Sequence, residues 1–306
     1  MKQESNVSVN LSAQDQQLVA DLDRKFQVIR DRVASVVGGY HTACYLVGRP
    51  GTSKTYTVKE ELEALGIPWI YQNARMTPMG LFEVLEEHPE HIVVLDDIAT
   101  VFSQPMALQI LMAALDGDPQ KPRTVTYRSK DRDERFQFSG GIIAISNVPL
   151  RNDPLARALG SRIVQLEHEP TDEEIAALMR KLAINGFGDM DALECLEVVE
   201  FVIEETRLYD QRLDLRHLNK AWQDFRQHRD GKAKTNWQDL VRTSLRKLMA
   251  DPVILPISKR EEVHLDRQRV REAMEKFPGD PKRQMEFSGL KKSSFYSHRR
   301  ELQAAG

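Results

Sequence analysis

The sequence has few cysteines and no long apolar run, and both absences exclude classes of protein. With only Cys44 and Cys195 among 306 residues, the chain is no disulfide scaffold, and we expect both to be reduced core residues of a cytoplasmic protein. No apolar stretch approaches the roughly 20 residues that cross a bilayer, so we expect no membrane contact. The polar segment 1–14 lacks the apolar centre of a signal peptide and is expected to be loosely attached.

A strong net charge is also lacking. The formal net charge is −3, and the content of 41% hydrophobic and 29% charged residues is ordinary for a soluble globular protein. The length favours two or three domains. Because the surface as a whole is not basic, any nucleic-acid interface has to be sought in a local patch.

The most informative segment is the glycine-rich stretch 48–55, Gly-Arg-Pro-Gly-Thr-Ser-Lys-Thr, called the phosphate loop below. It follows an apolar run at 43–47 and precedes a helical pattern at 58–65, so it joins a predicted strand to a predicted helix. Backbone N–H groups at a helix start bind anions. Lys54 would add a charge near the terminal phosphates, and the Thr55 hydroxyl would hold Mg²⁺. The predicted phosphate-binding residues are Gly48, Arg49, Pro50, Gly51, Thr52, Ser53, Lys54 and Thr55.

One position of the phosphate loop departs from the usual motif, because Ser53 stands where a glycine is usual before the lysine. A non-glycine residue at positive φ costs roughly 1–2 kcal/mol. The loop therefore either avoids that angle or tolerates the strain. The alternative interpretation of the segment is a turn that is merely rich in glycine.

A second group of polar residues follows another predicted strand. The apolar run 91–95 ends in Asp96 and Asp97. Asp96 would reach Mg²⁺ or its water shell, and Asp97 would orient or deprotonate the attacking water. The alternative is a pair of solvated turn aspartates, but their place about forty residues after the phosphate loop favours the carboxylate half of a nucleotide site.

The predicted elements define an α/β fold. Strands at 69–71, 91–95, 142–145 and 162–166 alternate with helical patterns, which indicates crossover units and a mostly parallel sheet of the P-loop NTPase type. A helix with apolar residues from 18 to 33 precedes the sheet and ends at Gly38. After Pro170, a capping box and helical patterns near 175–182, 190–206, 212–227 and 236–249 predict a helical domain, which we name the lid. The expected domains are a tail and helix at 1–39, the α/β core at 40–169, the lid at 170–250 and a small all-α domain at 258–306.

An inserted hairpin is expected before the strand at 142–145. Segments 124–127 and 135–138 alternate as strands do and flank a polar tip. Residues 121–135 include six basic and three acidic side chains, an excess that suits contact with a phosphate backbone. An ordinary solvated hairpin is the equal alternative. The candidate DNA contacts are Arg128, Lys130 and Arg132.

The carboxyl end is predicted to form a helix, a glycine-containing turn and a helix, the signature of a helix-turn-helix unit. Phe277-Pro278-Gly279 breaks the first helical pattern, and further patterns follow at 282–287 and 293–302. Residues 282–306 carry six Lys or Arg and two Glu, so this end is basic inside an acidic chain. Phe295 and Leu302 would face the core. The candidate DNA contacts are Lys291, Lys292, Tyr296 and Arg299; the alternative is a bundle that docks a protein.

Taken together, these motifs resemble the AAA+ ATPase family from about residue 40 to 216. The phosphate loop matches the family's first nucleotide motif, and Leu95-Asp96-Asp97 matches the second. The resemblance places Asn147 at the sensor-1 position and Arg216 at the sensor-2 position, while Asn73 falls where some members keep a polar switch residue.

The stretch Leu159-Gly160-Ser161-Arg162 resembles clamp loaders and Holliday-junction motors, in which this arginine acts on a neighbouring subunit's nucleotide. The resemblance therefore implies that Arg162, or else Arg157, serves as an arginine finger. Asp97 stands where many members have glutamate, although bacterial replication initiators also have Asp-Asp.

The resemblance implies ATP hydrolysis with Mg²⁺ in a homo-oligomer, either a ring or a filament, that acts on DNA. Replication initiation or loading, DNA motor activity and a transposition-type role all fit. The alternatives are an ATP-driven protein remodeller and a nucleotide switch, either with a C-terminal bundle that binds a protein partner.

Overall fold

The computed structural model describes residues 10–304, apart from 74, 99–100, 129–132, 151–153, 246–265, 268–269, 272, 275, 289 and 291. The chain separates into two compact units, residues 1–246 and 247–306, and each is considered by itself. Within the described residues, no helix is both long and apolar enough to cross a bilayer.

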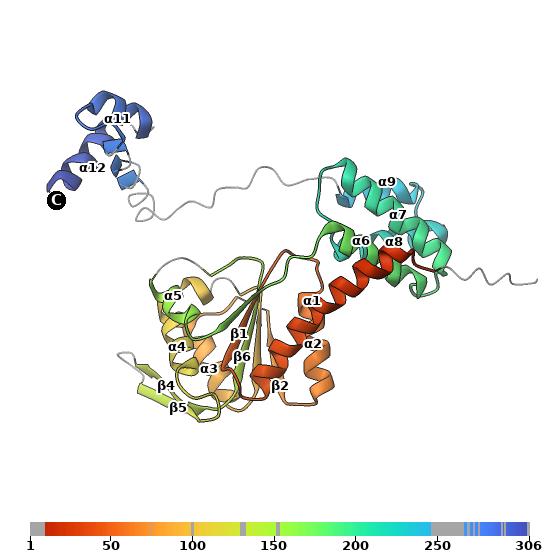
Figure 1. Cartoon of the computed structure of the whole chain (residues 1–306), viewed down its shortest axis with the longest axis horizontal. Helices are drawn as coiled ribbons and strands as arrows, with labels where there is room; N and C mark the ends of the chain where they lie inside the picture. Colours follow the sequence, from red (N-terminus) through yellow and green to blue (C-terminus); the bar gives the residue numbers. More distant parts are fainter. Residues whose placement is uncertain are drawn as a thin grey trace, which may run out of the picture. The chain divides into compact units, whose positions relative to one another are not determined.

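A five-stranded sheet forms the centre of the first unit, with strand order β2-β3-β6-β1-β7 and parallel pairing throughout (Figure 1). The strands are β1 (Ala43–Val47), β2 (Trp69–Gln72), β3 (Ile92–Asp96), β6 (Gly141–Ser146) and β7 (Val164–Glu167). Strands β3 and β6 are buried along their whole length, as expected for central parallel strands covered on both faces. The predicted α/β class and the predicted strands are confirmed.

Helices cover both faces of the sheet (Figure 1). Successive strand residues point to opposite faces, so Cys44 and Leu46 pack in the core with α1 and α2, whereas Ala43 and Tyr45 pack in the core with α3, α4 and α5. The helices are α1 (Ala13–Val37), α2 (Lys54–Leu65), α3 (Pro78–Glu87), α4 (Pro105–Leu115) and α5 (Pro154–Gly160).

Two parts of this layer differ from the sequence-based expectations. Helix α1 begins at Ala13, because the Ser12 side chain accepts a hydrogen bond from the Asp15 N–H at the N-cap, so residues 13 and 14 belong to the helix and not to the tail. Residues 98–120, for which no element was predicted, contain the 3₁₀ turn η1 (Val101–Ser103) and α4.

The predicted hairpin is present as β4 (Arg123–Arg128) and β5 (Asp133–Phe138), paired antiparallel. Its inner face, including Val125 and Phe138, packs beside α3 and α4. One of the six basic residues is not on the surface, since Arg123 is only 5% exposed. Arg128 is exposed but forms an ion pair with Asp133 at 2.6 Å. Lys130 and Arg132 lie outside the described residues.

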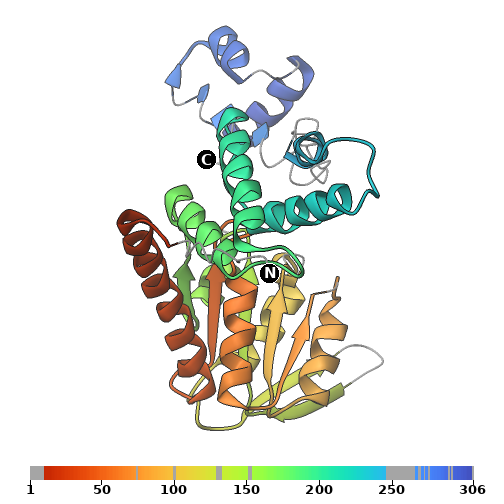
Figure 2. The ribbon, with the colours of Figure 1, turned by 90° about the vertical axis from the view of Figure 1, so that its right-hand side faces the viewer.

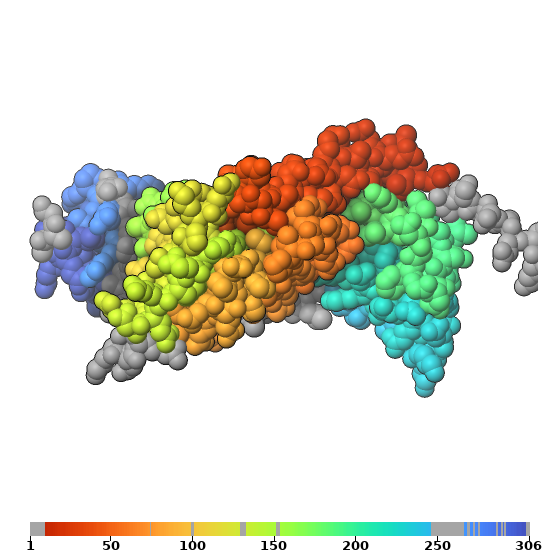
Figure 3. Space-filling view, turned by 90° about the horizontal axis from the view of Figure 1, so that it is seen from below, coloured from red at the N-terminus to blue at the C-terminus, as the bar shows by residue number. Residues whose placement is uncertain are grey.

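The helical lid consists of α6 (Asp172–Ile184), α7 (Ala192–Leu208), α8 (Leu215–Arg229) and α9 (Trp237–Leu245). Helix α6 begins with the predicted capping box of Thr171 and Glu174. Helix α1 spans both parts of the unit, because it packs on α2 and on α6 (Figures 2 and 3). The ion pair between Lys25 and Glu174, at 2.6 Å, joins α1 to the lid.

The second unit contains α11 (Pro281–Ser288) and α12 (Lys292–Ala304), preceded by further helical residues at 266–267, 270–271, 273–274 and 276. Gly279 adopts φ +81° directly after Pro278, where the helical pattern was predicted to break. Phe295 is fully buried with Val270 and Ala273, as the predicted small core requires.

Candidate functional site

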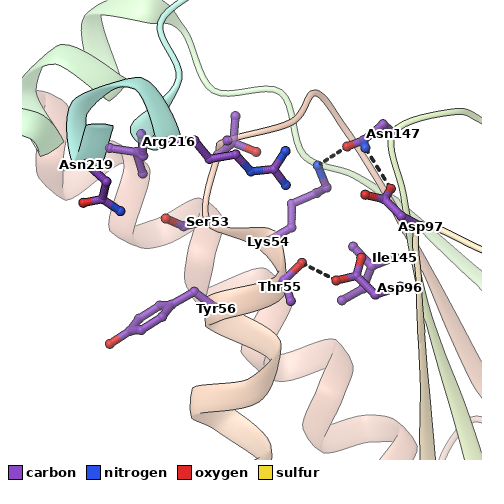
Figure 4. A pocket seen from close by; sticks show the side chains of 13 residues that line it. Ser53, Lys54, Thr55, Tyr56, Asp96, Asp97, Ile145, Asn147, Arg216 and Asn219 are labelled. Carbon is purple, nitrogen blue, oxygen red and sulfur yellow. Dashed lines mark hydrogen bonds between the residues drawn. The ribbon is translucent and has the colours of Figure 1, made fainter. Parts of the chain in front are cut away.

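A cavity of about 200 Å³ lies at the carboxyl ends of the central strands, between the phosphate loop and the lid (Figure 4). Ligands of open α/β sheets bind at this edge. The residues that line it are Gly51, Thr52, Ser53, Lys54, Thr55, Tyr56, Asp96, Asp97, Ile145, Asn147, Leu215, Arg216 and Asn219. The fold thus brings nine of the thirteen predicted nucleotide-site residues to this cavity, whereas Gly48, Arg49, Pro50 and Arg162 are not part of its lining.

The phosphate loop holds Ser53 in a strained conformation. Ser53 is the N-cap of α2, with φ 64° and ψ 14°, in the left-handed region. Its side chain makes no capping hydrogen bond, so no local contact of that kind offsets the roughly 1–2 kcal/mol cost of this conformation. Asp97, across the cavity, also has a positive φ of 53°. Backbone strain of this kind concentrates at functional sites.

Gly48 and Gly51 of the phosphate loop have no room for a Cβ, because other atoms approach each of them closely. A Cβ at Gly48 would lie 2.1 Å from the carbonyl oxygen of His168, and a Cβ at Gly51 would lie 1.7 Å from Oδ1 of Asp214. Gly51 also has φ 69°. A larger residue at either position would push the loop away from β7 or from the lid.

Lys54 is buried at the centre of the site. Its Nζ donates to the carbonyl oxygens of Gly48 and Arg49, each at 2.6 Å, and to Oδ1 of Asn147 at 3.1 Å. Burial lowers the pKa of Lys54, and the nearby carboxylates of Asp97 and Asp96 oppose this shift. To contact a phosphate, Lys54 has to exchange one of these carbonyl partners for a phosphate oxygen.

Asp96 accepts hydrogen bonds from two hydroxyl groups. Thr55 Oγ1 lies 2.8 Å and Tyr71 Oη 2.7 Å from its Oδ2. Burial and the bond to Asp96 raise the pKa of Tyr71 to about 12, so it stays a donor. Tyr71 was not predicted from the sequence; the available signal was a hydroxyl-bearing residue near the end of the strand beside β3.

The donor set around Asp96 fits Mg²⁺, because hydroxyl and carboxylate oxygens are the ligands this ion prefers. In the described part of the chain, no three His, Cys, Asp or Glu side chains form a metal cluster. Thr55 and Asp96 would therefore hold the ion together with oxygens of a bound nucleotide and water.

Asp97 is linked to Lys54 through Asn147. The Asn147 side-chain amide donates to Asp97 Oδ1 at 2.8 Å, while its oxygen accepts from Lys54 (Figure 4). Because β3 and β6 are paired, with Asp96 opposite Ile145, the polar residues that follow them meet at one sheet edge. Asp97 is exposed, so its carboxylate is free to orient a water molecule that enters the cavity.

Arg216 brings a positive charge from the lid. It lies in the first turn of α8, which begins after the N-cap Asp214, and its guanidinium points toward Lys54 in Figure 4. Among the described residues, no carboxylate forms an ion pair with it. Tyr56 and Asn219 also line the cavity and are largely exposed; neither was predicted from the sequence.

The phosphate loop is tied to the lid through Arg49, whose side chain turns toward Asp172 at 2.7 Å. Asp172 also accepts from the Leu213 N–H at 3.2 Å and pairs with Arg212 at 2.8 Å. A backbone hydrogen bond from Leu215 to Gly51, at 3.1 Å, adds a second link. These contacts therefore couple movement of the phosphate loop directly to the segment that carries Arg216.

His168, at the end of β7, supports the phosphate loop from the other side. Its Nε2 lies 3.2 Å from the Thr52 carbonyl oxygen, which can only accept, so Nε2 carries the proton. Burial lowers the pKa of His168 to about 4, and the ring is therefore neutral. Next to it, Glu169 accepts from the backbone N–H of Arg49 at 3.0 Å. Neither residue was predicted from the sequence.

The two arginine-finger candidates lie outside the cavity of their own chain. Arg162 pairs with Asp116 at 3.0 Å and donates to the Ala158 carbonyl at 2.7 Å, and Arg157 is exposed on α5. Neither arginine lines the cavity. A role of either one toward a neighbouring subunit stays a prediction.

The predicted DNA contacts of the second unit differ in exposure. Lys292 and Tyr296 are exposed on α12. Arg299 is half-buried, and its Nε is enclosed without a partner in the described part of the chain, so it is less accessible than expected. Lys291 lies outside the described residues.

The family resemblance rests on these residues alone. No protein-family model and no curated protein matches this chain.

Proposed function

We propose that this chain is an AAA+ ATPase that binds ATP with Mg²⁺, hydrolyses it in a homo-oligomer and acts on DNA. The observation that carries the proposal is the contact between two motifs distant in sequence: Thr55 of the phosphate loop donates to Asp96 at 2.8 Å. Beside them, the chain Lys54–Asn147–Asp97 closes the same cavity.

In this mechanism, the start of α2 and five side chains of the cavity have distinct roles. Backbone N–H groups at the start of α2 bind the phosphates, and Lys54 leaves a loop carbonyl to contact them. Thr55 and Asp96 would hold Mg²⁺, which would stabilise negative charge on the phosphate oxygens. Asp97 orients the attacking water and Asn147 holds the Asp97 carboxylate.

The lid responds to the nucleotide through two routes. Arg216 gains a partner when phosphates enter the cavity. The ion pair of Arg49 with Asp172 and the hydrogen bond from the Leu215 N–H to the Gly51 carbonyl connect the loop to the lid. Loss of the terminal phosphate would remove the attraction on Arg216 and change the angle between core and lid.

Oligomerisation and DNA binding are supported by separate features. Arg162 can reach a phosphate only if that phosphate belongs to a neighbouring subunit, because it lies outside its own cavity. The second unit presents Lys292 and Tyr296 on a helix of a basic segment, which suits contact with a nucleic acid.

The test is the ATPase rate of the full chain with and without duplex or single-stranded DNA. Asp97→Asn should reduce turnover about 100-fold or more and keep ATP binding, whereas Lys54→Ala should lose binding. Asp118→Asn and Lys121→Ala, at an exposed ion pair outside the cavity, are the matched controls. A nucleotide switch would instead turn over slowly and change little with Asp97→Asn.

The DNA arm of the proposal has its own outcome. An affinity that rests on roughly six phosphate contacts should fall about a thousandfold between 50 and 200 mM salt. Replacing Lys292 and Tyr296 by alanine should weaken it, while Arg283→Ala, exposed in the same unit but paired with Asp280, should have a smaller effect. ATP turnover that no DNA stimulates at any salt concentration would favour a protein remodeller.

A further inference from the structure

A second cavity lies at the opposite edge of the sheet from the candidate nucleotide site. Its volume is about 180 Å³. It is formed where β3 and β6 begin, at Ile92 and Gly141, and where α1 ends, at Val36 and Val37. The hairpin contributes Arg123, the first residue of β4.

Arg123 is a buried cation with few partners. It is 5% exposed, its Nη2 donates to the carbonyl oxygen of Gly140, and its guanidinium carbon lies 5.3 Å from the centre of the Phe138 ring. Among the described residues, Nε and Nη1 have no hydrogen-bond partner. Burial lowers the pKa of Arg123, and no neighbouring carboxylate opposes that effect.

A buried guanidinium normally has a counter-charge, because an unpaired charge in a low-dielectric interior is costly. The only carboxylate among the residues that line this cavity belongs to Glu90, which is exposed and forms no ion pair with Arg123 in the described part of the chain. His41 and Ser139 also line the cavity and offer further donors. The site therefore has a buried cation and further donors, and in the described part of the chain no carboxylate pairs with that cation.

We propose that this cavity binds a small oxyanion, a phosphate or carboxylate, through the guanidinium of Arg123. The fork of N–H groups in arginine matches two oxygens of such an anion. Because Nε and Nη1 are enclosed, the guanidinium turns toward the cavity on binding and exchanges the Gly140 carbonyl for the anion. His41 and the Ser139 hydroxyl complete the set of donors.

The experiment has to separate this site from the phosphate loop, which also binds anions. Thermal unfolding of the full chain is therefore measured in a Lys54→Ala background, with inorganic phosphate against chloride at equal ionic strength. We expect about 20 mM phosphate to raise Tm by about 2 °C or more. Adding Arg123→Met should abolish the rise, while Arg135→Met, exposed on the same hairpin, should preserve it.

No rise in the Lys54→Ala background, or an equal rise with Arg123→Met, would overturn the proposal. If Arg123→Met does not fold, Arg123→Gln keeps a donor for the Gly140 carbonyl but no charge, and equilibrium dialysis with labelled phosphate replaces the unfolding measurement. A tenfold or larger loss of phosphate binding supports the site, and unchanged binding refutes it. Neither readout depends on ATP turnover.

Discussion

Replacing Ser53 by glycine tests whether the phosphate loop stores backbone strain. Ser53 has φ 64° and its side chain makes no capping hydrogen bond, so the substitution removes an unfavourable conformation without losing such a contact. The same reasoning applies to Asp210, exposed after α7 with φ 49°, which lies outside the candidate site and offers a matched comparison.

The magnitude follows from two opposing terms. Relief of the left-handed conformation at Ser53 contributes roughly 1–2 kcal/mol, and the greater freedom of glycine in the unfolded chain costs roughly 0.5–1 kcal/mol. The expected net gain is roughly 0.5–1 kcal/mol, or about 1–3 °C in Tm for a unit of this size. Asp210→Gly should gain less, because aspartate tolerates positive φ better than serine.

The assay is reversible thermal or urea unfolding of the full chain without nucleotide. Ser53→Ala is the decisive control, since alanine also has a Cβ at positive φ and should give no gain. If Ser53→Gly lowered the free energy of unfolding, or if Ser53→Ala stabilised the chain equally, the strain argument would be wrong. Asp210→Gly should leave nucleotide affinity unchanged.

Three further predictions concern the contacts around the phosphate loop. Gly51→Ala should lower the free energy of unfolding by roughly 2 kcal/mol or more, because the new Cβ would clash with Asp214 and residue 51 would keep a positive φ. The variant should also bind ATP at least tenfold more weakly in calorimetry, and wild-type affinity would contradict this prediction. Arg49→Ala should lower the free energy of unfolding by roughly 1–2 kcal/mol, because Asp172 loses a partner. The variant should also reduce the protection of lid amides by ATP in hydrogen exchange. Unchanged protection would exclude Arg49 as the link between the phosphate loop and the lid. His168 has a pKa of about 4 in the fold, so it stays neutral there, whereas it protonates in the unfolded chain below about pH 6.5. The free energy of unfolding should therefore fall by about 2 kcal/mol from pH 7 to 5. His168→Gln should flatten that fall, and an unaltered pH profile in this variant would assign the fall to other groups.

Much of the fold was predictable because the signals are local. The apolar runs of β1, β3 and β6, the capping box of Thr171 and Glu174, and the glycines that end α1 each act within a few residues of the chain. The spacing of Gly48, Gly51, Lys54 and Thr55 likewise predicts a strand, loop and helix by short-range geometry alone. Helix α4 was missed, although its apolar sequence is compatible with a helix, because such a pattern lacks clear polar periodicity.

Arg123 shows that a basic residue of a predicted hairpin can be buried by the packing of its strand. The charge count of the hairpin treated Arg123 as a surface cation, yet the alternation of β4 places it on the same face as the buried Val125. Strand parity could have indicated that position. It could not have indicated that Nε and Nη1 face no carboxylate, because that depends on which elements close around the strand.

The sequence by itself determined the elements and the phosphate loop, since these depend on neighbours along the chain. Only the tertiary structure decided that Tyr71 and Thr55 share Asp96, that His168 supports Thr52, and that Arg49 turns to Asp172. The order of the strands brings these residues to one sheet edge across separations of up to 123 positions. Contacts of that range follow from how the chain closes on itself, and residue spacing alone does not specify them.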